Sequence, residues 1–153
     1  VTVILNPAPA CPLPAELLSL VDVLIPNETE AALLTGLPVG DLGQARAAAT
    51  ALKAMGVGTV VLTLGERGAL LSIGREPLHC PAIPVETVDT TAAGDAFVAG
   101  LAVALVEGQP VHEAVRWANA AGALATTVLG AQPSLPHRQA VEALLVGEKR
   151  QAG

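Results

Sequence analysis

One stretch of seven residues has the residue types and the spacing that phosphoryl transfer requires. Asp89–Asp95 reads Asp-Thr-Thr-Ala-Ala-Gly-Asp and leads directly into an apolar segment of helical character. The small residues Ala92, Ala93 and Gly94 let a ligand approach the backbone, and the free amides at a helix N-terminus form an anion hole. A carboxylate at Asp95, in the first turn, is suited to take a proton from a hydroxyl that attacks a phosphoryl group. The alternative is structural: Asp95 only caps the helix and Gly94 only turns the chain.

Two further polar clusters could bind a phosphorylated ligand or its metal ion. Thr63–Gly68 reads Thr-Leu-Gly-Glu-Arg-Gly after an apolar run, and its backbone amides could cradle phosphates. It is neither a Walker A motif nor a dinucleotide fingerprint, and an ordinary hairpin turn also explains it. Asn27 and Glu30 lie three residues apart on one helix face, where both can address a hydrated Mg²⁺. Helix capping with acid in the first turn is the structural alternative.

Short apolar runs that alternate with helical segments predict the scaffold that positions these clusters. Val1–Leu5 and Val21–Ile25 are expected to be strands, and the near-continuous apolar run Thr59–Leu64 is typical of a strand buried on both faces. A hairpin-like stretch follows, with a second turn at Gly74–Pro77. Val85–Val88 is expected to be the apolar strand before the third cluster. Because ligands bind beyond the carboxyl ends of strands in open parallel sheets, we expect all three clusters to face such a site.

Capping residues and helical periodicity predict the helices. Asn27 and Asp41 are plausible N-caps, and Gly36 stops the first of these two helices. Strands that alternate with helices through short loops predict one α/β domain, a parallel sheet covered by helices. The other predicted helices are Glu16–Leu20, a segment from Asp95 to about Val106, Val111 to about Val128 with an inner stripe of Val111, Ala114, Val115, Ala118, Ala121 and Ala125, and Gln139–Val146 after a loop at Gly130–Pro136.

Length and composition exclude several classes of function. A chain of 153 residues is one domain's worth, and 52% apolar with 14% charged residues excludes a disordered chain. Aromatic residues make up 1% and the net charge is −6, so we expect no nucleic-acid partner. Cys11 and Cys80 are too isolated for a disulfide framework or a zinc site. His79, His112 and His137 are expected to be exposed and to bind no metal. We predict no signal peptide, no membrane span and a cytoplasmic location.

Taken together, five motifs resemble one known family. Asp89–Gly100, DTTAAGDAFVAG, resembles the anion-hole and catalytic-aspartate signature of the ribokinase family, the PfkB-type carbohydrate kinases. Four other motifs occur in the order that this family has, and they resemble ribokinases more than fructokinases or adenosine kinases. The resemblance spans essentially the whole chain and implies a ribokinase-like fold, α/β with three α/β/α layers around a parallel sheet. The four motifs are Asn6–Ala10 (NPAPA), Pro26–Ala31 (PNETEA), Thr63–Gly68 (TLGERG) and Gly130–Pro136 (GAQPSLP).

The resemblance implies a reaction and a role for each matched residue. Asp95 would deprotonate the primary hydroxyl of D-ribose, and the amides of Ala92, Ala93 and Gly94 would hold the phosphate that is transferred from ATP, giving ribose 5-phosphate. Asn119 would line the adenine pocket. The phosphates and ribose of the nucleotide would be contacted by Thr63, Leu64, Gly65, Glu66, Arg67 and Gly68.

Two ions are also implied by the resemblance. Asn27 and Glu30 resemble the NxxE motif that organises Mg²⁺ and the γ-phosphate. A potassium ion, typical of ribokinases, would polarise the anion-hole loop. Backbone carbonyls dominate its expected ligands, which are oxygens from Asp89, Thr91, Ala125, Val128, Gly130 and Ser134.

The main departure from the family is length. Complete members are about twice as long, and the part without a counterpart here is the N-terminal one, which supplies most sugar contacts and a β-sheet lid. We therefore predict that residues 1–153 form the C-terminal nucleotide-binding and catalytic portion, with little kinase activity unless a partner chain supplies the rest. The alternatives are a nucleotide-binding fragment without catalysis and another PfkB-type sugar or nucleoside kinase. An unpaired sheet edge could also pair two copies into a homodimer.

Overall fold

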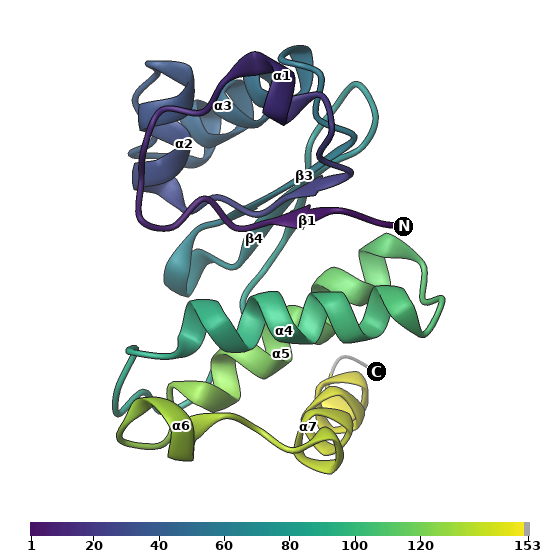
Figure 1. Ribbon diagram of the computed structural model, residues 1–153. Coiled ribbons are helices and arrows are strands. Elements are labelled where there is room, and N and C mark those ends of the chain that lie inside the picture. The colour runs from purple at the N-terminus through teal and green to yellow at the C-terminus, as the bar shows by residue number, and fades with distance from the viewer. Residues whose placement is uncertain (152–153) are drawn as a thin grey trace. The chain divides into compact units, whose positions relative to one another are not determined.

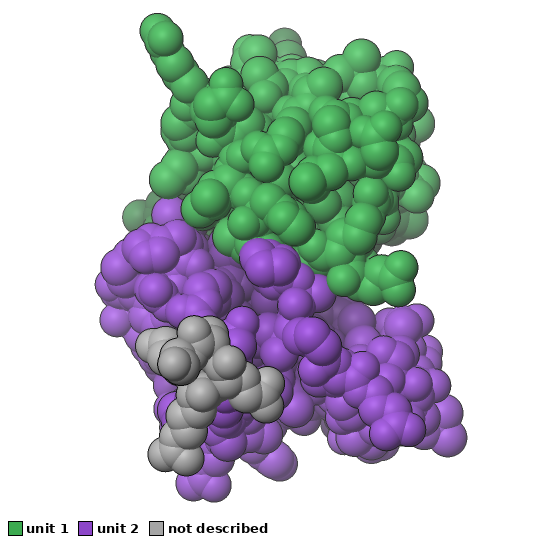
Figure 2. All heavy atoms as spheres, turned by 180° about the vertical axis from the view of Figure 1, so that it is seen from behind, with its two compact units in different colours: residues 1–80 green, residues 81–153 purple. Residues whose placement is uncertain are grey.

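The chain folds as two units, Val1–Cys80 and Pro81–Gly153, which Figure 2 colours separately. The computed structural model describes the backbone of residues 1–151 and the side chains of residues 1–148. Within that range, all strands belong to the first unit, and the second consists of helices and the loops that join them. The first unit therefore holds both predicted nucleotide clusters, and the second holds the predicted catalytic cluster.

A five-stranded sheet in the order β1-β2-β3-β4-β5 forms the framework of the first unit (Figure 1). β1, β2 and β3 are parallel, whereas the β3–β4 and β4–β5 pairs are antiparallel. The predicted α/β class is confirmed, but the sheet is mixed, because the connection after β3 is too short for the crossover that a parallel pair needs. The strands are β1 (Ile4–Leu5), β2 (Val23–Leu24), β3 (Thr59–Thr63), β4 (Ala69–Ser72) and β5 (Leu78–Cys80).

Three helices of the first unit lie on the same side of this sheet in Figure 1: α1 (Ala15–Leu18), α2 (Glu28–Thr35) and α3 (Leu42–Ala54). The predicted caps form, since Asp41 accepts a hydrogen bond from the Gln44 amide at 2.8 Å. The inward side of α3 is built from small residues, which lets the helix lie close to the strands. Its fully buried residues are Ala45, Ala48, Ala49 and Leu52, which join Val60, Leu62 and Leu70 in one hydrophobic core.

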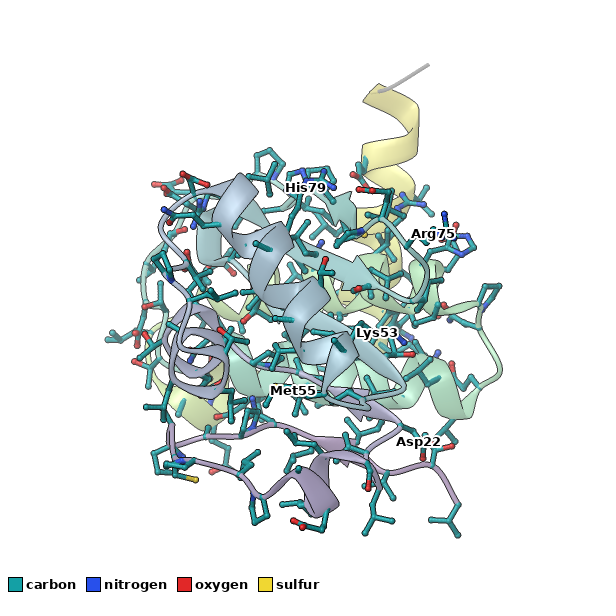
Figure 3. All side chains as sticks on the ribbon, turned by 90° about the horizontal axis from the view of Figure 1, so that it is seen from above. Asp22, Lys53, Met55, Arg75 and His79 are labelled. Atoms are coloured by element: carbon teal, nitrogen blue, oxygen red, sulfur yellow. The ribbon has the colours of Figure 1, made fainter. Side chains whose placement is uncertain are left out.

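One side chain that Figure 3 labels holds the start of β1, and two others mark the end of α3. Asp22, before β2, accepts a hydrogen bond from the backbone amide of Val3 at 2.7 Å, which holds the start of β1. Lys53 and Met55 lie at the carboxyl end of α3. The chain leaves this helix through Gly56, whose φ of 100° is unfavourable for a residue with a Cβ atom.

Four helices make up the second unit: α4 (Ala93–Val106), α5 (Val111–Ala125), α6 (Ala131–Ser134) and α7 (Arg138–Gln151). α4 and α5 pack closely because glycine stands at the contact. A Cβ atom added to Gly100 would lie 2.9 Å from the Cβ of Ala121. The predicted inner stripe of α5 is buried except for its first residue, so this pair of helices gives the N-terminus of α4 a rigid support.

Several predicted elements differ from the observed ones by a few residues at their ends, and three differences affect the segments around the site. Val85–Val88 forms no strand, because the amides of Val88 and Asp89 both donate to the Thr126 carbonyl at the end of α5 instead of to a neighbouring strand. Gly130–Pro136 was expected to be a loop, but α6 lies within it. α5 ends three residues before Val128. There the Thr126 and Thr127 hydroxyls donate to the carbonyls of Ala123 and Leu124, in the last turn of the helix.

Candidate active site

The two predicted nucleotide clusters meet at one edge of the sheet in the first unit. β2 and β3 are parallel, so the loops that follow them leave from the same edge. The Thr63 amide donates to the Pro26 carbonyl at 2.9 Å, and the Thr63 hydroxyl lies 3.4 Å from the same oxygen. The structure thus brings the start of the Thr63–Gly68 loop against the residue that precedes Asn27.

Asn27 and Glu30 form a complete capping box at the start of α2. The Asn27 side chain accepts from the Glu30 amide at 2.9 Å, and the Glu30 carboxylate accepts from the Asn27 amide at 2.8 Å. Glu30 is only 4% exposed. The structural alternative raised by the sequence is therefore realised, and any role with a metal ion is additional to it.

These two residues suit Mg²⁺ only as a partly hydrated ion. Among the residues that the structure describes, no three His, Cys, Asp or Glu side chains gather as a metal site. One Glu30 oxygen is committed to the cap, which leaves the other oxygen of the carboxylate. Mg²⁺ keeps several waters and uses one or two carboxylates together with substrate phosphates. Glu30 with the phosphates of a bound nucleotide would satisfy that requirement.

The loop after β3 is a tight turn with free amide groups. Gly65 and Gly68 have φ angles of 56° and 89°, which favour glycine. The loop closes on itself through the Leu64 amide, which donates to the Gly68 carbonyl at 2.8 Å, and the Arg67 amide, which donates to the Leu64 carbonyl at 3.1 Å. Within the described residues, the amides of Gly65 and Glu66 donate to no protein acceptor. These two N–H groups are therefore available to an anion.

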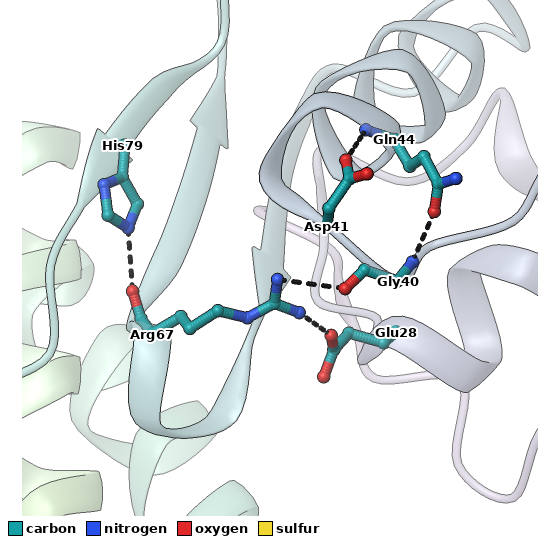
Figure 4. Close-up of polar contacts among 6 residues, drawn as sticks. All are labelled: Glu28, Gly40, Asp41, Gln44, Arg67 and His79. Carbon is teal, nitrogen blue, oxygen red and sulfur yellow. Dashed lines mark hydrogen bonds and ion pairs between the residues drawn. The ribbon is translucent and has the colours of Figure 1, made fainter.

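The Arg67 side chain does not point its guanidinium freely at a ligand. It forms an ion pair with Glu28 and donates to the Gly40 carbonyl at 3.3 Å (Figure 4). His79 was expected to be exposed, but it is half-buried, with Nε2 2.7 Å from the Arg67 carbonyl. Sequence reasoning missed Glu28, Gly40 and His79, because these contacts join residues that are distant in the chain and have no shared motif.

In the second unit, the N-terminus of α4 has the features of an anion site. Ala92 is the N-cap and supplies no side-chain hydrogen bond. The Ala93 amide donates to the Thr90 carbonyl at 3.2 Å, but in the described structure the amides of Ala92 and Gly94 have no protein acceptor. A Cβ atom added to Gly94 would meet nothing within 4 Å. Packing therefore does not require glycine here, and an external ligand can approach this backbone.

Asp95 is exposed, and among the described residues it makes no hydrogen bond or ion pair. Asp95 therefore makes no capping hydrogen bond, and what is left of the structural alternative is its place in the first turn, where the helix dipole favours an acid. Its carboxylate stands in the first turn of α4, beside the free Gly94 amide, and keeps both oxygens open to a ligand. This is the arrangement that a general base next to an anion hole requires.

Three of the residues expected around potassium, Asp89, Thr91 and Gly130, come together in the second unit. The Asp89 carboxylate accepts from the Thr91 hydroxyl at 2.6 Å, from the Thr91 amide at 3.0 Å and from the Gly130 amide at 2.9 Å. The Thr91 hydroxyl, followed by the Gly130 amide, lowers the pKa of Asp89 below its ordinary value, so the group is anionic. These bonds tie the anion-hole loop to the segment after α5.

The remaining donors of this set also fit a cation that prefers oxygen. In the described part of the chain, the carbonyls of Ala125 and Val128 accept no hydrogen bond. The Ala125 carbonyl is at the negative end of α5. Ser134 is buried, and its hydroxyl donates to the Ala131 carbonyl at 2.7 Å, which leaves its lone pairs for an ion. Carbonyl, hydroxyl and carboxylate oxygens suit a hard monovalent cation.

Asn119 lies in the same unit, on α5, and is 8% exposed. Its Nδ2 atom donates to the Pro81 carbonyl at 3.1 Å, so the side chain anchors the start of the segment that leads to α4. Its expected place beside adenine is not tested by this contact and stays a prediction. The other two histidines, His112 and His137, are exposed as expected.

Two features of this chain are typical of proteins that transfer phosphoryl groups. One is an exposed carboxylate at a helix N-terminus with free amides, and the other is a glycine turn with free amides after a parallel strand. The sequence profile of the pfkB family carbohydrate kinases matches residues 1–138. The chain belongs to this family.

Curated relatives agree with the match. The chain is 46% identical over 139 residues to the ribokinase of Haemophilus influenzae, covering 91% of this chain and 45% of that protein. It is 45% identical to the ribokinase of Arabidopsis thaliana over 136 residues, or 88% of this chain and 36% of the relative. A deoxyribokinase of Salmonella typhi is 39% identical over 89% of this chain and 45% of its own length. The chain thus spans about half the length of the curated relatives it matches.

Solved structures confirm the ribokinase-like fold. A structure of Arabidopsis thaliana ribokinase complexed with ribose and ATP superposes with a TM-score of 0.89 at 44% identity, covering 95% of this chain and 47% of that one. A Vibrio cholerae fructokinase with fructose, ADP and potassium ion bound gives 0.73 at 35% identity over 85% and 42% of the two chains. A protein described as a ribokinase II from E. coli, in complex with ATP and Mg²⁺, gives 0.73 at 31% identity over 86% and 41%. No described helix of this chain is long and apolar enough to cross a membrane.

Proposed function

We propose that this chain is the nucleotide-binding and catalytic portion of an ATP-dependent sugar kinase that phosphorylates the primary hydroxyl of D-ribose. The observation on which the proposal rests is Asp95, which is exposed and unpaired within the described structure and follows the open Gly94 amide. The identity to ribokinases and the superposition on a ribokinase with ribose and ATP support the choice of substrates.

In the proposed reaction, the Asp95 carboxylate takes the proton of the sugar's primary hydroxyl. The hydroxyl oxygen forms a bond to the γ-phosphorus of ATP, and the bond between that phosphorus and the β–γ bridging oxygen breaks, giving ADP and the sugar phosphate. The free amides of Ala92 and Gly94 would donate to the equatorial oxygens, where negative charge is spread in the transition state. The Ala93 amide would join them on leaving the Thr90 carbonyl.

The nucleotide would be held by the first unit. Amides of the Thr63–Gly68 loop would bind its phosphates, with Glu66 and Gly65 offering the two free N–H groups. Glu30 and the phosphates would hold Mg²⁺, which would neutralise charge on the phosphoryl group. Potassium, held by the Asp89–Thr91 loop and the carbonyls after α5, would keep the anion-hole loop in place. Neighbouring structures with Mg²⁺ or potassium support both ions. Location in the cytoplasm and pairing of two copies stay predictions.

Calorimetry of the 153-residue chain with Mg·ADP tests the nucleotide site directly. Turnover is best measured in a hybrid in which this chain replaces the matched 139 residues of the Haemophilus influenzae ribokinase. In that hybrid, Asp95→Asn is expected to lower kcat by about 10²-fold or more while the affinity for ATP stays similar. Equal turnover of Asp95→Asn and the unsubstituted hybrid would refute the base assignment.

A second candidate function is another sugar kinase of the same family, favoured by the 39% identity to a deoxyribokinase. Assays of the hybrid would still report the sugar preference of the other half. The acceptor is therefore tested with the longest natural polypeptide that contains this sequence, across ribose, deoxyribose and fructose. If that polypeptide binds Mg·ADP but phosphorylates none of them, the nucleotide-binding role without catalysis is the one that stands.

A further inference from the structure

The Arg67 side chain joins the predicted nucleotide loop to two other segments of the first unit (Figure 4). Its guanidinium makes an ion pair with Glu28 and donates through Nη1 to the Gly40 carbonyl at 3.3 Å. Glu28 is the first residue of α2, directly after Asn27, and Gly40 precedes Asp41, the N-cap of α3. One side chain therefore links the loop after β3 to the N-terminal ends of two helices.

The two anchor points of Arg67 are themselves held in place. The Gly40 amide donates to the Gln44 side chain at 2.7 Å, while the Gln44 amide donates to Asp41, so a short ring of bonds orients the Gly40 carbonyl. On β5, His79 contacts the Arg67 main chain, with Nε2 2.7 Å from its carbonyl oxygen. Because a carbonyl oxygen only accepts, Nε2 is the donor. Contacts of both the side chain and the backbone of Arg67 thus hold the turn in place.

We propose that Arg67 is a positioning residue and not a phosphate ligand. With Glu28, Gly40 and His79 it fixes the Thr63–Gly68 loop relative to the turn that carries Asn27 and Glu30. This inference rests on the proposed nucleotide site, in which the free amides of the loop and the Glu30 carboxylate address one bound nucleotide. The side chains of Arg67 and Glu28 are 35% and 37% exposed. The guanidinium group is planar and carries its donors in fixed directions, so it can hold both side chains in one geometry.

Removing the charge of Glu28 distinguishes this role from direct phosphate binding. If Arg67 bound phosphate, Glu28→Gln would free its guanidinium and remove a negative charge near an anionic ligand, so nucleotide would bind more tightly. If Arg67 positions the loop, the same substitution loosens the turn, and nucleotide binds more weakly. The two hypotheses therefore predict changes of opposite sign.

Arg67→Lys also distinguishes loop positioning from phosphate binding. The lysine ammonium group is a good phosphate ligand, but it lacks the several fixed donors with which the guanidinium group reaches both Glu28 and Gly40. We expect Arg67→Lys to weaken binding about as much as Arg67→Gln does.

The experiment is calorimetric titration of the 153-residue chain with Mg·ADP. Glu28→Gln is expected to raise Kd about threefold to tenfold, and the Glu28→Gln/Arg67→Gln double variant should bind no more weakly than Arg67→Gln alone. Glu113→Gln is the matched control, because Glu113 pairs with Arg116 at 3.3 Å and is 43% exposed. Its Kd should not change. Unchanged or tighter binding by Glu28→Gln, additive effects in the double variant, or full affinity in Arg67→Lys would each overturn the inference.

Amide hydrogen exchange without nucleotide separates failure of this inference from failure of the proposed function. The Arg67 and Gly68 amides donate within the turn, at 3.1 Å to Leu64 and 3.0 Å to Gly65. They should exchange several-fold faster in Glu28→Gln and at the wild-type rate in Glu113→Gln. If the wild-type chain binds no ADP, the proposed function fails. The exchange rates then still test whether Arg67 positions the loop. Faster exchange in Glu28→Gln then supports the positioning of the loop by Arg67, and unchanged exchange overturns it.

Discussion

Two glycines of α4 should respond in opposite ways to the same substitution. A Cβ atom on Gly100 would lie 2.9 Å from the Ala121 Cβ and 3.4 Å from the Ala118 Cα, whereas one on Gly94 would meet nothing within 4 Å. Alanine gains about 1 kcal/mol over glycine within a helix, and overpacking costs roughly 1–3 kcal/mol. Gly100→Ala should therefore lose about 0–2 kcal/mol of unfolding free energy, while Gly94→Ala, which has the helix gain without the overpacking, should gain about 1 kcal/mol.

Urea denaturation followed by tryptophan fluorescence measures this difference. Trp117 is the sole tryptophan, and its Cδ1 atom lies 3.5 Å from the position of the added Gly100 Cβ, so its signal reports on the α4–α5 contact. In a turnover assay the order should reverse, because a methyl group on Gly94 occupies the approach to the free amide that would hold the transferred phosphoryl group. The hybrid kinase should show a lower kcat in Gly94→Ala than in Gly100→Ala. Equal stability of the two variants would refute the packing argument, and wild-type kcat in Gly94→Ala would refute the anion hole.

The remaining predictions concern Asp89 and Asn27. The Thr91 hydroxyl and the Gly130 amide lower the pKa of Asp89 below 3.8, so its stabilising effect is complete above that value and is lost as the pH falls through the lowered pKa. The stability difference between wild type and Asp89→Asn should therefore shrink as the pH falls below about 5 in acid denaturation followed by circular dichroism; a constant difference would contradict it. Asn27→Ala should lose about 1 kcal/mol in urea denaturation because α2 loses its cap, whereas Asn27→Asp keeps an acceptor and should stay near wild type. Equal losses in the two Asn27 variants would show that the cap contributes nothing.

Signals that act within one helical turn could be predicted well from the sequence. Asp41 caps α3 and Gly36 ends α2 in the left-handed conformation, as their residue types indicate. The alanine stripe of α5 is buried because its period places it on one face. In each case the determining contact joins residues at most four positions apart, so a local pattern contains the information.

Features that depend on distant residues were predicted poorly. Val85–Val88 has the composition of a strand, but its last amide is taken by the Thr126 carbonyl, which no local pattern reveals. The role of His79 depends on the Arg67 carbonyl, twelve residues away on a neighbouring segment. The glycine-rich motif places Arg67 in the expected nucleotide loop, but it does not show that the guanidinium pairs with Glu28 on another helix. The sequence contains these residues, and only the fold specifies which of them meet.

The case of Glu30 explains why residue spacing alone could not distinguish a helix cap from a metal site at the start of α2. A capping box needs a side-chain acceptor at the N-cap and a carboxylate three residues later, and an Mg²⁺ site on a helix N-terminus needs the same pair on the same face. The two roles are compatible because a carboxylate has two oxygens: one accepts from the Asn27 amide, and that bond holds the other in a fixed orientation. A metal ion coordinated there would meet a ligand that is already immobilised. Hence the cap is a reason for Glu30 to serve a nucleotide's metal ion well, and not an argument against it.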